Sequence, residues 1–120
     1  DSVSKAEKIA TEMMNHPEDY KVFWGNVYSV YIKARTKRIP EAKKILDKFL
    51  SQKELSIREV LGKIKNANYA DKVFTDYISY ILILTYDTNL LEELTNEFLI
   101  DEAEFDEERL KKLKKEFKVP

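Results

Sequence analysis

The chain has 120 residues, and its 21 Lys and Arg nearly balance its 22 Asp and Glu, which gives a formal net charge of −1. It contains no Cys, which excludes disulfides, thiol catalysis and Cys-based zinc sites. Two Gly and three Pro are too few for the turns of an all-β fold, so we expect one helical domain over residues 1–120 with short loops.

Three amphipathic helices are predicted in the first half of the chain. The first spans about Val3 to Asn15, and its apolar residues fall on one helix face: Ala6, Ile9, Ala10 and Met13. The second starts near Pro17, and Gly25 in its interior indicates a close helix crossing, because Gly costs roughly 1 kcal/mol against Ala inside a helix. The third begins at Pro40 and has this apolar face: Ala42, Ile45, Leu46, Phe49 and Leu50.

The most apolar stretch of the chain, Val73 to Leu91, lies in the second half. Before it, Ser56 and Glu59 have the spacing of a capping box, which predicts a helix start. We predict a buried helix from about Ala70 to Tyr86, with these core residues: Phe74, Tyr77, Ile78, Ile81 and Leu84. A membrane span needs roughly 20 apolar residues, and the continuous apolar run here is about half that length, so we expect a core helix.

Two more helices complete the prediction. Asn89 and Glu92 are expected to cap the first of them, and Asp106 the second. The fold class is therefore all-α, a compact bundle of six or seven helices.

The helical pattern shows signs of an internal duplication. A shift of 51 residues places the KVF of 21–23 on the KVF of 72–74, and a shift of 49 places the FL of 49–50 on the FL of 98–99. Any two amphipathic helices share a periodicity, so chance similarity stays open beside duplication. A duplication predicts stacked repeats of ~50 residues. Their ranges are residues 3–52 and 54–101, followed by a C-terminal helix at 105–118.

Charge is distributed unevenly along the chain. Residues 33–65 hold 11 basic and 4 acidic residues, whereas residues 87–108 hold 10 acidic and no basic ones. Lys outnumbers Arg 17 to 4, a thermophile-like composition. A nearly neutral total therefore conceals a dipolar charge distribution, which affects association rather than fold.

Two charged groups are candidate interaction sites. The basic group, a site for nucleic-acid phosphates or for a protein, is Lys33, Arg35, Lys37, Arg38, Lys43, Lys44 and Lys48. The acidic group is Glu92, Glu93, Glu97, Glu102 and Glu104. Each group is also explained as an ordinary solvated helix face. The acidic run lacks the loop Gly and the ligand alternation of an EF-hand, which argues against calcium binding.

An aromatic band follows the spacing of one face of the second helix. Its members are Tyr20, Phe23, Trp24, Tyr28 and Tyr31. This spacing is typical of a core face, so we expect the band to pack in the core. The alternative is base stacking, as in single-strand binders.

No catalytic constellation or phosphate-binding loop can be assembled from the sequence. His16 is the only His, and with Glu12 it supplies two metal ligands without a third. Because Pro17 follows it, we expect His16 at a helix boundary. We therefore expect no enzyme, no cofactor and no metal site.

The sequence favours a non-catalytic helical adaptor or accessory subunit that mediates protein–protein interaction within a larger complex. The partner is another protein subunit, or a second copy bound through opposed charge patches. The alternative is a nucleic-acid-binding accessory subunit that uses the basic region 33–65. Because no signal peptide, lipidation motif or membrane span is recognisable, we expect a cytoplasmic protein without membrane contact.

Overall fold

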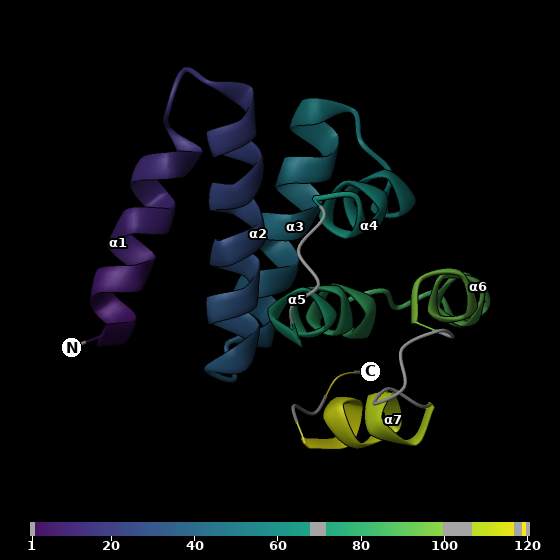
Figure 1. Ribbon diagram of the computed structural model, residues 1–120. Coiled ribbons are helices and arrows are strands. Elements are labelled where there is room, and N and C mark those ends of the chain that lie inside the picture. Colours follow the sequence, from purple (N-terminus) through teal and green to yellow (C-terminus); the bar gives the residue numbers. More distant parts are fainter. Residues whose placement is uncertain (1, 68–71, 100–106, 117–118, 120) are drawn as a thin grey trace. The chain divides into compact units, whose positions relative to one another are not determined.

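The computed structural model describes residues 2–67, 72–99, 107–116 and 119, and in these residues the chain is all-α, without a strand (Figure 1). The predicted fold class is confirmed. The helices are α1 (Ser2–Met14), α2 (Asp19–Arg35), α3 (Ile39–Lys53), α4 (Ile57–Lys65), α5 (Lys72–Ile83), α6 (Thr88–Leu99) and α7 (Glu107–Glu116).

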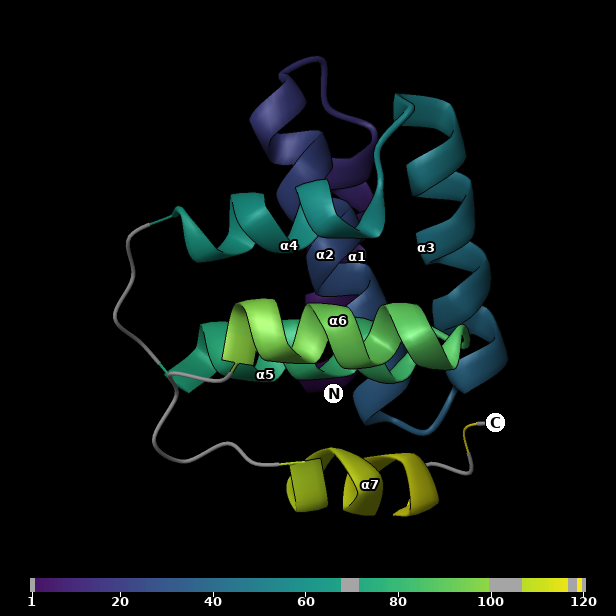
Figure 2. The ribbon, with the colours of Figure 1, turned by 90° about the vertical axis from the view of Figure 1, so that its right-hand side faces the viewer.

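The chain divides into two compact units, which we call the N-terminal unit, residues 1–54, and the C-terminal unit, residues 55–120. The N-terminal unit contains α1 to α3, with α2 packed against both of the others. In the C-terminal unit, α5 contacts each of α4, α6 and α7 (Figure 2). The internal duplication stays a prediction.

The N-terminal unit depends on a very close approach of α1 to α2. A Cβ atom added at Gly25 would lie 2.6 Å from the backbone nitrogen of Met14 and 2.9 Å from the carbonyl oxygen of Ala10. The predicted close crossing at Gly25 is therefore confirmed. α1 contacts α2 through Ala10, which is fully buried. This contact orients α1 so that the neighbouring residue, Ile9, faces solvent and is 57% exposed. The predicted inner position of Ile9 is wrong.

Small side chains, not aromatic ones, form the inner face of α2. Its buried residues are Val22, Gly25, Asn26, Val27, Ser29, Val30 and Ala34. No member of the predicted aromatic band is among them: Tyr20 is exposed, which corrects its expected core position, whereas Phe23, Trp24, Tyr28 and Tyr31 are half-buried. Large rings on the inner face would hold the α1 and α2 backbones apart, and the Gly25 contact does not allow that separation.

Most of the described core residues of the C-terminal unit are aliphatic. Its buried apolar residues are Val60, Leu61, Ile64, Ile78, Ile81, Leu82, Ile83, Leu84, Leu91, Leu94, Phe98 and Leu110. Three of the predicted core residues are therefore confirmed (Ile78, Ile81 and Leu84). Tyr77 is half-buried, and the Phe74 side chain lies outside the described residues.

Buried hydroxyls in this core bond within their own helix segments. Ser79 donates to the carbonyl of Thr75 at 2.7 Å, and Thr95 to that of Leu91 at 2.6 Å. Thr85 donates to the carbonyl of Ile81 at 3.2 Å. Each hydroxyl thus satisfies a backbone carbonyl four residues earlier.

The helix ends confirm some capping predictions and correct others. Ser56 and Glu59 form the predicted capping box, and each side chain bonds the backbone N–H of the other residue. Asp87 caps α6, because its carboxylate accepts the Leu90 N–H at 3.0 Å. The predicted cap at Asn89 is therefore wrong, since Asn89 already lies in the first turn of α6. Asp106 lies outside the described residues.

The apolar helix α5 ends earlier than predicted. The backbone N–H of Leu84 bonds the carbonyl of Ile81 at 3.1 Å, and that of Thr85 bonds the carbonyl of Leu82 at 2.9 Å. These three-residue bonds tighten the last turn and end the helix at Ile83. Leu84 and Thr85 nevertheless stay buried.

The two glycines offer a matched test of the close crossing. We expect Gly25→Ala to lower the free energy of unfolding by about 1–3 kcal/mol, because its methyl group overlaps backbone atoms of α1. Gly62→Ala has no neighbouring atom within 4 Å of the added methyl group. It is expected to raise stability by up to about 1 kcal/mol through helix propensity. Urea unfolding followed by circular dichroism measures both, and a stabilising Gly25→Ala would contradict the packing described above.

Candidate interaction surfaces

The C-terminal end of α2 forms a Schellman motif. The N–H of Arg38 donates to the carbonyl of Lys33 at 2.8 Å, and the N–H of Lys37 donates to that of Ala34 at 3.0 Å. Lys37 has φ 65°, the left-handed conformation that Gly usually adopts at this position. The motif brings the side chains of Lys33 and Arg38 to the same end of the helix.

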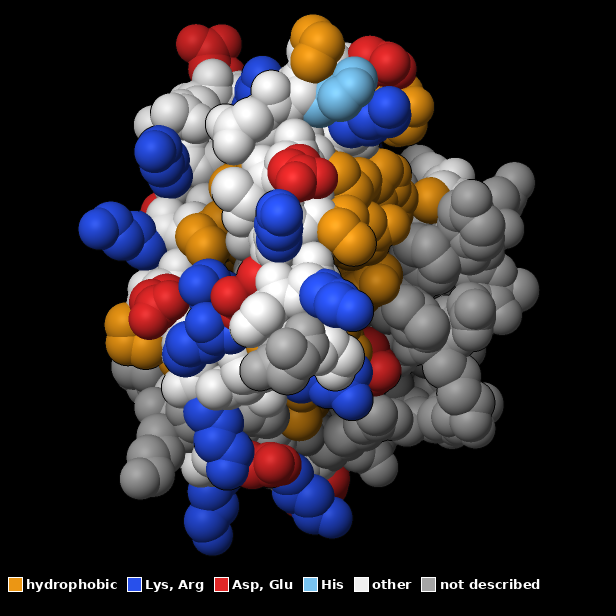
Figure 3. Space-filling view, turned by 90° about the vertical axis from the view of Figure 1, so that its left-hand side faces the viewer, with side chains coloured by type: hydrophobic (Ala, Val, Ile, Leu, Met, Phe, Trp, Pro, Cys, Tyr) orange, Lys and Arg blue, Asp and Glu red, His pale blue; other side chains and the backbone are white. Residues whose placement is uncertain are grey.

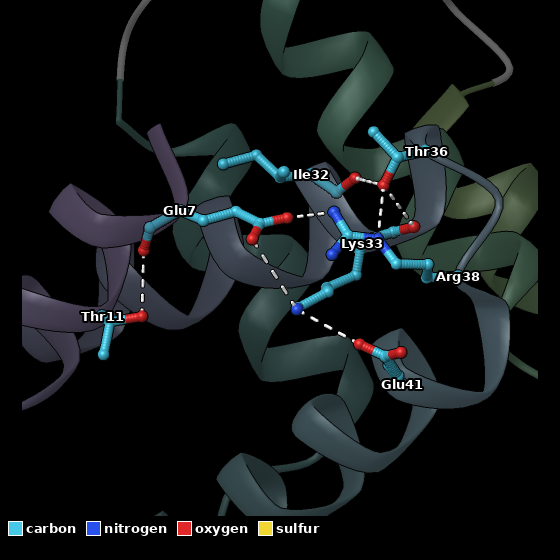
Figure 4. Close-up of polar contacts among 7 residues, drawn as sticks. All are labelled: Glu7, Thr11, Ile32, Lys33, Thr36, Arg38 and Glu41. Atoms are coloured by element: carbon cyan, nitrogen blue, oxygen red, sulfur yellow. Dashed lines mark hydrogen bonds and ion pairs between the residues drawn. The ribbon is translucent and has the colours of Figure 1, made fainter. Parts of the chain in front are cut away.

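Both side chains bind one carboxylate of α1 (Figure 4). The Arg38 guanidinium donates a hydrogen bond to Glu7 Oε1, and Lys33 Nζ lies 3.9 Å from Glu7 Oε2. Lys33 also lies 3.1 Å from a carboxylate oxygen of Glu41 on α3. Two residues of the predicted basic site therefore join α1, α2 and α3.

Thr36 fixes the position of the Arg38 side chain. Its hydroxyl accepts a hydrogen bond from Arg38 Nε at 2.9 Å and donates to the carbonyl of Ile32 at 2.7 Å (Figure 4). The guanidinium thus uses different nitrogens for Thr36 and for Glu7. Arg38 therefore uses its guanidinium for contacts within the N-terminal unit.

The same contacts shift the titration of Glu7. The hydrogen bond from Arg38 lowers the pKa of the Glu7 carboxyl below its ordinary value; burial opposes this shift, and the charge of Lys33 supports it. The carboxylate is therefore favoured in the folded unit, and its charge contributes to stability.

The remaining basic residues differ in how far their charge is available. Lys43 forms an ion pair with Asp47 at 2.8 Å. Arg35 donates to the Tyr31 hydroxyl at 2.8 Å, and its guanidinium lies 5.7 Å from the centre of that ring. The exposed members, which have no ion pair within the described residues, are Lys37, Lys44 and Lys48.

The acidic group is partly bound within its own unit. Arg58 of α4 donates to Glu93 at 2.7 Å and to Glu97 at 2.8 Å, both on α6. Glu92 is exposed, whereas Glu102 and Glu104 lie outside the described residues. Opposed charge patches as a route to self-association stay a prediction, although several of their charges have partners inside a unit.

Neither Glu7 nor Arg58 was identified as a site residue from the sequence. Arg38 is 31 residues from Glu7, and Arg58 is 35 and 39 residues from its two partners. The pair of Lys43 and Asp47 has the four-residue spacing that a sequence reveals, and the pairs of Lys21 with Glu18 and of Lys111 with Glu108 have the three-residue spacing. The long-range pairs depend on how the helices pack.

The outward side of α2 carries an aromatic face, which we define as Tyr20, Trp24 and Tyr28. These residues lie four positions apart, and the Trp24 and Tyr28 ring centres are 5.7 Å apart. Tyr20 is 59% exposed, and the other two are half-buried. Phe23 lies beside this face and packs on Trp24 at 5.2 Å and on Phe49 of α3 at 5.9 Å.

Hydrophobic side chains gather on the molecular surface beside the single His (Figure 3). That residue, His16, precedes α2 and accepts the Glu18 N–H at 3.0 Å, so its predicted place at a helix boundary is confirmed. Lys21 Nζ lies 3.4 Å from the second ring nitrogen of His16 and 5.8 Å from the Tyr20 ring centre. The start of the aromatic face is thus bordered by polar groups.

No protein-family model, curated protein or solved structure matches this chain. Within the parts of the chain that the structure describes, none of the helices combines the length and apolar character needed to cross a bilayer.

Lys37→Gly tests the motif that places Arg38. Gly adopts the left-handed conformation without the roughly 1–2 kcal/mol cost of an L side chain. It also increases the entropy of the unfolded chain, so we expect a net gain of about 0.5–1 kcal/mol in unfolding free energy. Lys44→Gly, in the interior of α3, is the control and should lose about 1 kcal/mol. Equal losses in both variants, measured by urea unfolding, would contradict the positive φ at Lys37.

Glu7→Gln tests the carboxylate at the centre of the ion-pair cluster. We expect the variant to be less stable than the parent at neutral pH. Because the pKa of Glu7 is lowered by folding, this difference is present above the ordinary pKa of the carboxyl and disappears as pH falls through the lowered value. Urea unfolding at a series of pH values measures it.

Glu12→Gln is the control for this series, because Glu12 is exposed on the same helix and has no ion pair within the described residues. A stability difference for Glu7→Gln that does not change with pH, or an equal effect in the control, would show that Glu7 has no special role.

Proposed function

We propose that the chain is a non-catalytic adaptor that binds another protein through the aromatic face of α2. The observation that supports this most directly is Tyr20, a large ring that is 59% exposed at the start of that face. Trp24 and Tyr28 continue the same stripe along the helix. Tyr and Trp are the residues most enriched among those that dominate the binding energy of protein interfaces.

The aromatic face is held in place before any partner binds. Phe23 packs edge-on against Trp24, and it also contacts Phe49 of α3. Rings that are already positioned lose little conformational entropy on binding, so more of the contact energy contributes to affinity. This supports a preformed binding surface.

The surroundings of Tyr20 match the usual composition of an interface. Lys21 and Glu18 lie at the same end of α2, with their charged groups 3.9 Å apart. Interfaces typically combine an apolar centre with a polar, solvated rim. Here the aromatic rings provide the apolar centre, and the charged turn of Glu18 and Lys21 provides the polar rim.

The alternative, nucleic-acid binding through region 33–65, has weaker support from the geometry. Lys33, Arg38 and Lys43 each bind carboxylates within the N-terminal unit. A phosphate contact there competes with those ion pairs, so the available charge is mainly that of the exposed lysines. The adaptor proposal does not require any ion pair to break.

The adaptor proposal can be tested at one residue with a matched control. Tyr20→Ala removes the most exposed ring among the described residues, and Ile9→Ala removes a similarly exposed apolar side chain from α1. Partners are isolated from the native host with the parent chain and then titrated against all three proteins. A ring at the centre of an interface contributes more than about 1.4 kcal/mol, so we expect at least tenfold weaker binding for Tyr20→Ala and little change for Ile9→Ala.

Trp24 gives this titration a reporter inside the proposed site, because it is the only Trp of the chain. Binding at the aromatic face should change its fluorescence. A partner that binds without changing the Trp24 emission, or that is weakened equally by both substitutions, would show that the aromatic face is not the site.

A further inference from the structure

Helix α7 has the densest cluster of positive charge in the chain. Four of its five consecutive residues from 111 to 115 are Lys, and Leu113 is the exception. Lys111, Lys112 and Lys115 are exposed, and Lys114 is half-buried. We refer to these four lysines as the α7 lysine cluster.

The apolar side of α7 is already used within the C-terminal unit. Leu110 is buried, Leu113 is half-buried, and α7 contacts α5. An amphipathic helix binds a membrane surface by inserting its apolar face. Because that face packs on the protein, the α7 lysine cluster is left to act through its charges.

The charges of the cluster are largely available. Lys111 lies 3.7 Å from Glu108, but the two side chains are 71% and 72% exposed, and such surface pairs are weak. The other three lysines have no ion pair within the described residues. This differs from the basic group of the N-terminal unit, in which Lys33 and Arg38 hold Glu7.

We propose that the α7 lysine cluster is a contact surface for the phosphates of nucleic acids, separate from the aromatic face and independent of the adaptor function. Lysine favours this occupant over a protein, because Lys is depleted in protein–protein interfaces but is a standard phosphate contact. Like charges at 111 and 115 repel each other at a four-residue spacing, and a bound polyanion relieves that repulsion.

The chemistry of α7 also predicts how the nucleic acid is recognised. The cluster itself contains no Asn or Gln, the residues that read adenine, and Arg109 stands just before it in α7. Because lysine contacts to phosphates carry no sequence information, we expect binding through the cluster to depend little on base sequence. Four lysines give a log–log salt slope of at most about −3.6 on duplex DNA, so affinity falls roughly 100-fold between about 50 and 200 mM salt.

The test is binding of the full chain to a labelled duplex over that salt range, with two triple variants of equal charge. The site variant combines Lys111→Gln, Lys112→Gln and Lys115→Gln. The control combines Lys37→Gln, Lys44→Gln and Lys48→Gln, three exposed lysines of the N-terminal unit. We expect the site variant to bind at least tenfold more weakly at about 50 mM salt and to lose about three units of slope, with the control close to the parent.

A third variant separates loss of charge from loss of structure. Lys111→Arg, Lys112→Arg and Lys115→Arg together keep the charge, so this protein should retain both the affinity and the slope of the parent. Circular dichroism of each variant confirms that the helices are intact.

Several results would overturn the proposal. They are a parent that does not bind the duplex at the lower salt, a site variant that binds as the parent does, and a control that loses as much affinity as the site variant. A parent that binds polyglutamate at least as tightly as the duplex would assign the cluster to an acidic protein instead.

Discussion

The close contact between α1 and Gly25 determines the organisation of the N-terminal unit. Because the α1 backbone occupies the space where a side chain would stand, the inner face of α2 consists of small residues. The larger rings of the helix then lie at its sides and its outer surface, where Tyr20 reaches solvent. A partly exposed aromatic face is thus a consequence of packing two helix backbones closely, and the surface proposed for a partner arises from the same constraint.

The charged residues of the chain serve two different purposes. Lys33 and Arg38 belong to a surface that looks basic in the sequence, yet both bind Glu7 and so connect helices. Arg58 does the same for two glutamates of α6. On α7, by contrast, three of the four clustered lysines are exposed, and the fourth, Lys114, is half-buried. The density of charge along the sequence does not distinguish residues that form ion pairs between helices from residues whose charge is exposed, because an ion pair depends on which helices are neighbours.

The fold class and several helix ends were predictable because they depend on neighbouring residues. The capping box of Ser56 and Glu59 is of this kind. The close crossing is a contact between helices, and it was predictable because Gly is unfavourable inside a helix and so indicates a need for space. The outward position of Ile9 was not predictable, since its spacing fits an inner face and only the contact at Ala10 rotates α1. The cap at Asp87 was missed because two acceptors, Asp87 and Asn89, stand close together. The core position expected for Tyr20 was wrong for the same reason as that of Ile9, because helical periodicity shows which residues share a face and not which face points inward.

The buried hydroxyls of the C-terminal unit have a consequence for its mechanics. Ser79, Thr85 and Thr95 all bond carbonyls four residues earlier, so none of these hydroxyls links one helix to another. Small movements of a helix against its neighbour therefore leave these three hydrogen bonds intact, because each donor moves with its acceptor. The register of α4 against α6 depends instead on side-chain packing, on the contacts of Arg58 and on the hydrogen bond from Lys65 Nζ to the Phe98 carbonyl. The three hydroxyls thus stabilise their own chain segments, and the apolar area of the core holds one segment against the next.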